Sequence, residues 1–194
     1  MKMYKVILFC IFSCFSTTLW SQIDQGKVLL SGGIQYQKSG DFDQFSGGIG
    51  AAYFFSSNSA IGLSIGRGYE QILDFNPQIT GEAKTTFISV YTRRYFSIAN
   101  QFYFFLQPSV GYVRVELDEV FSGEEIEDES ILIGLSPGFT FYPGERFGIE
   151  FSMTGLVYQF ADSDSDEGSF LFDISPLSPS IGISFLLGKS TASE

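Results

Sequence analysis

The chain has 194 residues, of which 44% are hydrophobic and 17% charged, and its formal net charge is −11. This length allows one domain with a sizeable core, or one barrel, and an acidic chain without a basic run is a poor candidate for nucleic-acid binding. The absence of histidine excludes Ser-His-Asp hydrolysis, Cys-His catalysis and His-based metal sites. We therefore expect no enzyme activity and no cofactor.

The first 21 residues have the pattern of a secretory signal peptide. Two lysines precede a mostly apolar run, which is followed by small polar residues. The run is too short for a membrane helix. We expect cleavage after about Ser21, which leaves residues 22–194 as a single domain. Both cysteines, Cys10 and Cys14, lie in the leader, so we expect no disulfide in the mature chain.

Apolar and polar residues alternate in eight later segments. The clearest pair flanks the turn at residues 143–146: Ile133 and Phe139 share one face, and Gly134 and Ser136 share the other. Side chains alternate across a strand, so a period of two predicts β-strands. Small residues opposite an apolar face are typical of a narrow barrel that is apolar outside and packed inside. The segments are 27–37, 45–55, 60–71, 85–96, 102–117, 131–142, 147–158 and 177–187.

The connections between these segments alternate in length. Three short ones cover residues 56–59, 97–101 and 143–146, whereas the others are longer and more polar: 38–44, 72–84, 118–130 and 159–176. Outer-membrane barrels have short periplasmic turns, long outer loops and an even number of strands. The pattern therefore predicts an all-β fold, an eight-stranded antiparallel up-and-down transmembrane β-barrel.

Two other features bear on this barrel. Aromatic residues cluster beside all three short turns, which predicts a girdle at the lipid–water interface. Pro108 and Pro137 fall inside alternating segments, where proline removes a ladder hydrogen bond. We expect a β-bulge at each of these prolines.

Several short motifs resemble the small outer-membrane β-barrel proteins common in Bacteroidota. They are GGIQY at residues 32–36, AIGLSIG at 60–66, RRYF at 93–96, GLSPG at 134–138 and IGISF at 181–185. This resemblance implies an eight-stranded fold of the OmpA/OmpX kind in the cell outer membrane. The expected partners are outer-membrane lipid, lipopolysaccharide and the outer-membrane assembly machinery, and a monomer is expected.

Charged residues inside the alternating segments are candidates for ion pairs in the lumen. Arg93 shares a face with Ser89 and Tyr91, and Glu150 lies among Gly148 and Ser152. A buried charge is costly unless it is paired. We predict lumen ion pairs with Arg93 and Glu150 as the leading members. The further candidates lie near the outer ends of the third and fifth segments: Arg67, Glu70 and Glu116.

The acidic connections are candidates for weak divalent-cation binding. Residues 162–166 read Asp-Ser-Asp-Ser-Asp, as an EF-hand loop begins, but Glu167 stands where that loop needs glycine. Solvated loops are the alternative, and no metal site is assigned. The residues concerned are Glu124, Glu125, Glu127, Asp128, Asp162, Asp164 and Asp166.

The function that follows is a structural or surface-interaction role for a barrel with a closed lumen and acidic extracellular loops. Two alternatives stay open. One is a secreted calycin-like barrel that binds an apolar small molecule, which would require the apolar face to point inward. The other is a narrow pore, although an eight-stranded lumen is only just wide enough for side chains.

Overall fold

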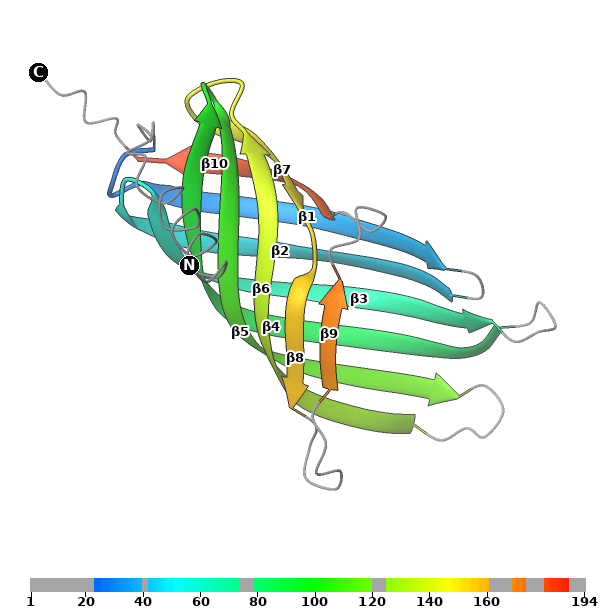
Figure 1. Cartoon of the computed structure of the whole chain (residues 1–194). Helices are drawn as coiled ribbons and strands as arrows, with labels where there is room; N and C mark the ends of the chain where they lie inside the picture. Colours follow the sequence, from blue (N-terminus) through cyan, green and yellow to red (C-terminus); the bar gives the residue numbers. More distant parts are fainter. Residues whose placement is uncertain are drawn as a thin grey trace, which may run out of the picture.

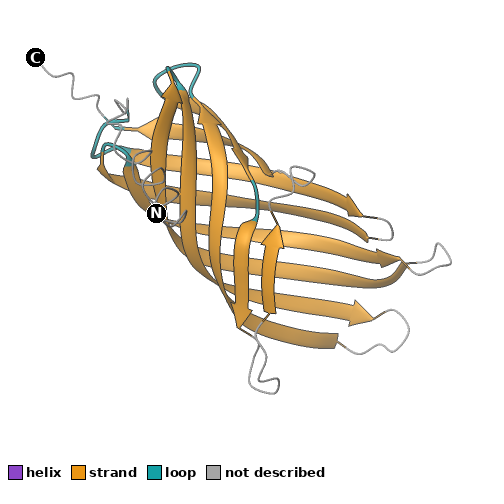
Figure 2. Cartoon of the chain, viewed as in Figure 1, coloured by secondary structure: helices purple, strands orange, loops and turns teal. Residues whose placement is uncertain are grey.

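The computed structural model describes residues 23–39, 42–73, 79–119, 125–160, 169–173 and 180–188. The predicted signal peptide lies outside the described residues. Ten strands and no helix are assigned in the described part (Figure 2). The strands are β1 (Val28–Ser39), β2 (Phe42–Ser56), β3 (Ser59–Leu73), β4 (Ile79–Ala99), β5 (Phe102–Glu119), β6 (Glu125–Phe141), β7 (Phe147–Ser152), β8 (Gly155–Phe160), β9 (Ser169–Asp173) and β10 (Ser180–Leu187). No helix among the described residues is long and apolar enough to span a membrane.

The strands form one closed antiparallel sheet (Figure 1). Each strand from β1 to β6 pairs with the next in the chain, and β10 pairs with both β1 and β7. Strand β6 pairs with β7 near one end and with β8 near the other. Thus β7 and β8 together form the seventh barrel strand, and β9 and β10 the eighth. The predicted eight-stranded antiparallel barrel is confirmed.

The seventh strand is interrupted opposite Pro137. Residues 153 and 154 leave the ladder, and the register against β6 moves by one residue between Ser152 and Leu156. The amide of Met153 donates to the carbonyl of Pro137 at 3.0 Å, and Gly155 has a φ of 74°. The bulge predicted at Pro137 therefore lies in the neighbouring strand, where a left-handed glycine accommodates the extra residue.

Other predicted boundaries need correction. At Pro108 the β4–β5 ladder omits two pairs but resumes in the same register, so the predicted bulge is absent and only the hydrogen bonding is interrupted. Strand β4 has 21 residues. Strand β5 ends at Glu119 and β6 begins at Glu125, so both strands include residues of a connection that was predicted to be a loop. Strand β9 lies within the loop predicted at residues 159–176. The added parts of β5 and β6 are rich in acidic residues and carry no regular apolar face, so alternation did not reveal them, whereas β9 carries Phe170, Leu171 and Phe172 but is only five residues long.

The two faces of the sheet differ as the alternation predicts. Outward positions carry the exposed apolar side chains, such as Ile49, Leu63 and Ile133. Inward positions carry small or polar residues, such as Gly62 and Ser184. The short turns gather at one end of the barrel, which we call the turn end (Figure 2). Backbone hydrogen bonds there join a turn to the neighbouring strand, as from the amide of Tyr95 to the carbonyl of Asn58.

The aromatic clusters beside the short turns divide between these two faces. Outward rings contact one another around the turn end, as in the pairs Phe96–Phe104, Phe104–Phe139 and Phe147–Phe185. These outward rings form a band of the kind predicted for a girdle. The alternate rings point inward and are buried, and we call them the aromatic plug: Phe54, Tyr95, Tyr103, Phe105 and Tyr142.

Candidate functional site

An ion pair is buried in the lumen next to the aromatic plug. Arg93 and Glu150 are each only 7% exposed. Nη1 of Arg93 donates to both carboxylate oxygens of Glu150, at 2.9 Å to Oε1 and 2.8 Å to Oε2. A charged pair removed from water is tolerated only when its members satisfy each other, and this geometry meets that condition.

Small residues on neighbouring strands make room for the pair. Arg93 lies opposite Ala60 in the β3–β4 ladder. Glu150 lies opposite Gly182 of β10 and Thr140 of β6. Long side chains could not stand at these inward positions together with Arg93 and Glu150, because the interior of an eight-stranded barrel is narrow. The alternation of each strand and the small partners together direct the two charges toward each other.

Three further groups complete the surroundings of the guanidinium. Its Nε donates to Oε1 of Gln107 at 2.8 Å, and Nη1 donates to the hydroxyl of Tyr95 at 3.1 Å. The ring centroid of Phe105 lies 4.2 Å from the central guanidinium carbon, which is a cation–π distance. Gln107 and Tyr95 were not among the predicted members of this site. Tyr95 lies two residues after Arg93 on β4, and Gln107 lies two residues after Phe105 on β5. Strand alternation therefore places these side chains on the inward face, and this was the signal that could have identified them.

The aromatic plug closes the lumen on the turn-end side of the ion pair. The ring of Tyr95 lies 5.5 Å from Phe54, 6.2 Å from Tyr103 and 5.9 Å from Phe105, measured between centroids. Ile23, which precedes β1, is 2% exposed and belongs to the same buried cluster. At this level buried side chains pack against one another across the lumen, and a hollow of about 350 Å³ lies beside them among Ile23, Gln101 and Glu145.

The other side of the ion pair is lined by small residues. A cavity of about 120 Å³ adjoins Tyr91, Arg93, Gln107 and Glu150, and a second of about 320 Å³ lies among serine, glycine and apolar side chains. The hydroxyls of Ser64 and Ser89 are hydrogen-bonded at 2.7 Å. The two groups of the ion pair engage each other, so neither of them is free to act as an acid or base.

The other predicted members of lumen pairs lie elsewhere. Arg67 is exposed on the outward face of β3, because strand alternation places it on the same face as Leu63 and Ile65. Glu116 is exposed on the outward face of β5, where Nε of Arg114 lies 3.4 Å from its carboxylate. The lumen assignments of Arg67 and Glu116 are therefore wrong. Glu70 has inward parity but forms no ion pair with the other residues that the structure describes.

The acidic candidates for cation binding are only partly described. Glu127 and Asp128 are exposed and lie in β6 rather than in a loop, and Glu127 accepts a hydrogen bond from Nη2 of Arg114 at 2.6 Å. In the described part of the chain, no three acidic side chains are grouped so that they could hold a metal ion. The side chain of Glu125 and the whole of Glu124, Asp162, Asp164 and Asp166 lie outside the described residues.

Comparisons with known proteins address the fold. No family model matches the sequence, and no curated protein matches it. The N-terminal β-barrel domain of Pseudomonas aeruginosa OprF is 16% identical with a TM-score of 0.53, over 84% of this chain and 98% of that one. Neisserial surface protein A is 14% identical with a TM-score of 0.54, over 82% and 94%. Pseudomonas aeruginosa OprG is 11% identical with a TM-score of 0.52, over 87% and 99%. The fold is that of an outer-membrane β-barrel.

Proposed function

We propose that this chain is an integral protein of the cell outer membrane, with a closed barrel and a non-enzymatic structural or surface-interaction role. One observation carries the proposal: the large apolar side chains that are exposed among the described residues lie on outward strand positions. Ile49, Leu63 and Ile34 are 68%, 59% and 59% exposed. An apolar surface this continuous requires lipid around it, because water-soluble proteins rarely expose large apolar patches.

Other features support the orientation and the route. The expected signal peptide would direct export, and the assembly machinery of the outer membrane would insert the barrel. The short turns would face the periplasm and the long acidic connections the cell exterior, as in barrels of this class. The closed ladder leaves no complete edge strand for pairing with another chain, which favours a monomer. The lipid and lipopolysaccharide around the outward face would be its immediate partners.

The two alternatives are less well supported. A calycin-like barrel that binds an apolar ligand would turn its apolar face inward, whereas that face points outward. A pore would need a continuous lumen, whereas the aromatic plug and the Arg93–Glu150 pair fill one end. We therefore do not retain the hypothesis of a calycin-like barrel, and we expect the barrel not to conduct ions.

Fractionation of cells that express the full chain tests this proposal. We expect the protein in the outer-membrane fraction, with a faster gel mobility before heating than after it. In planar bilayers, the purified barrel should show no stepwise conductance. A folded protein that stays soluble without detergent would overturn the membrane location. Regular conductance steps from the folded barrel would overturn the closed lumen only.

A further inference from the structure

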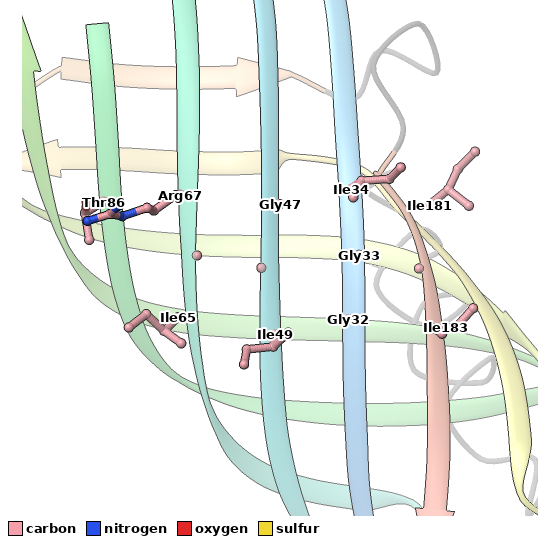
Figure 3. A pocket seen from close by; sticks show the side chains of 13 residues that line it. Gly32, Gly33, Ile34, Gly47, Ile49, Ile65, Arg67, Thr86, Ile181 and Ile183 are labelled. Carbon is pink, nitrogen blue, oxygen red and sulfur yellow. The ribbon is translucent and has the colours of Figure 1, made fainter.

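The outward face of the barrel carries a groove that spans β10, β1, β2 and β3 (Figure 3). Its volume is about 860 Å³, and its walls are the side chains of five isoleucines. Its floor is open because Gly32 and Gly47 occupy outward positions where neighbouring strands carry large apolar residues. The isoleucines are Ile34, Ile49, Ile65, Ile181 and Ile183.

The fold does not require glycine at these two outward positions. A Cβ at Gly32 would lie 3.6 Å from its nearest neighbour, and one at Gly47 would lie 3.5 Å away, both ordinary contacts. Neither residue has a positive φ. By contrast, a Cβ at the inward Gly66 would overlap the ring of Phe87. Glycine inside a strand weakens it, so the two outward glycines lower stability without a packing reason.

A cation stands at the edge of the groove. Arg67 of β3 lies opposite Gly47 in one ladder and opposite Thr86 in the other. Its side chain is exposed and extends across β4 toward Thr86 (Figure 3), and it forms no ion pair with another described residue. Arg67 lies about eight residues beyond Ser59, which at about 3.3 Å per residue and a tilt of about 40° places it roughly 20 Å above the turn end.

This height decides which part of the membrane Arg67 meets. The apolar band of such a barrel is about 25 Å tall, so Arg67 lies near its outer edge, within reach of headgroups. The row above it in the ladders consists of Tyr36, Phe45, Tyr69 and Lys84, so three of its four side chains carry a polar group. The isoleucine-lined part of the groove lies at the same level as Arg67 or nearer the turn end, inside the band.

We propose that the groove binds lipopolysaccharide of the outer leaflet, with an acyl chain over Gly32 and Gly47 and a phosphate on Arg67. This inference rests on the membrane location proposed above. Arginine suits a phosphate because its planar N–H groups can donate two parallel hydrogen bonds, and the hydroxyl of Thr86 lies beside it. A second copy of the chain fits less well, since a two-fold contact would set hollow against hollow and Arg67 against Arg67.

The test uses the full chain, purified from outer membranes in detergent and examined by native mass spectrometry with added monophosphoryl lipid A. We expect one lipid per barrel and about tenfold weaker retention after enzymatic removal of the phosphate. Arg67→Gln should reduce retention of the phosphorylated lipid to that of the dephosphorylated lipid. Gly47→Val fills the floor and should reduce retention of both lipids.

Two matched controls separate the groove from the rest of the outward face. Ala51→Ile adds three carbon atoms, as Gly47→Val does, on the same face of β2, and Arg94→Gln removes an exposed arginine near the turn end; both should leave retention unchanged. Equal losses in the controls, equal binding of phosphatidylethanolamine, or a dimer in place of the lipid adduct would each overturn the inference. A wild-type chain that does not reach the outer membrane would instead refute the proposed function.

Discussion

Arg93 of β4 and Glu150 of β7 meet inside the barrel although 57 residues separate them in the chain, and Nη1 of Arg93 bonds both carboxylate oxygens. Glu150→Ala would leave the guanidinium buried with Gln107 and Tyr95 as its remaining hydrogen-bond partners. Removing one member of a buried pair costs about 3–5 kcal/mol. We expect a loss of that size in the free energy of unfolding, measured by urea titration of the refolded barrel in lipid vesicles.

The exposed pair of Arg114 and Glu127 provides the control for that experiment. Its members are 40% and 54% exposed, so Glu127→Ala should cost less than about 1 kcal/mol. The double variant Arg93→Met with Glu150→Leu should be more stable than Glu150→Ala alone, because no unpaired charge remains. If Glu150→Ala cost no more than Glu127→Ala, the buried pair would not have the structural role described here.

Gly62 marks a position where the inward face has no room. A Cβ there would lie 2.5 Å from the carbonyl oxygen of Ala51 and 2.8 Å from the ring of Tyr91. Overpacking of this kind costs about 1–3 kcal/mol, so Gly62→Ala should lower the urea midpoint. The matched change on the outward face, Gly47→Ala, should leave the midpoint unchanged or raise it. The opposite order would contradict the assignment of inward and outward faces.

Gln101 is the one non-glycine residue with a positive φ in the described chain, at 68° in the β4–β5 turn. A left-handed conformation costs an L-residue about 1–2 kcal/mol, part of which glycine recovers. Gln101→Gly should raise the free energy of unfolding by up to about 1 kcal/mol in the same titration. Asn100→Gly, one residue earlier and without a positive φ, should not raise it. Equal effects of the two changes would refute the strain at Gln101.

The orientation can be tested with a thiol reagent that does not cross membranes. No cysteine occurs after Cys14. Asp128 is exposed near the outer end of β6, and Glu145 is exposed in the β6–β7 turn. In intact cells, Asp128→Cys should be labelled and Glu145→Cys should not, whereas both should react after lysis. Labelling of Glu145→Cys alone in intact cells would reverse the proposed orientation.

The alternation of residue types predicted most of the barrel. It assigned faces correctly wherever large apolar and small residues alternate, as at Ile133 and Gly134. It placed the short turns because these are the polar gaps between apolar segments. It also selected Arg93 and Glu150, since each shares its face with small or polar neighbours.

The remaining differences have physical causes. The lumen was predicted for Arg67 and Glu116 because they are charged. Strand alternation places each of them on the same face as outward apolar residues, and this alternation was the better guide. The break at residues 153 and 154 depends on Pro137 in the neighbouring strand, and such a contact is invisible along one segment. The groove depends on Gly32 lying opposite Ile49 and Gly47 lying opposite Ile34 in the β1–β2 ladder, which only the register reveals.

Quenching by brominated lipids tests the central claim most directly. Single cysteines at each position from Ile131 to Ser136 would carry a fluorescent label in the barrel refolded in vesicles of brominated phospholipid. The structure predicts strong quenching at Ile131, Ile133 and Leu135, which are 52%, 46% and 36% exposed on the outward face. It predicts weak quenching at the other three positions of the scan. Strong quenching at Leu132, Gly134 and Ser136 instead, or no alternation at all, would contradict a barrel with its apolar face in lipid.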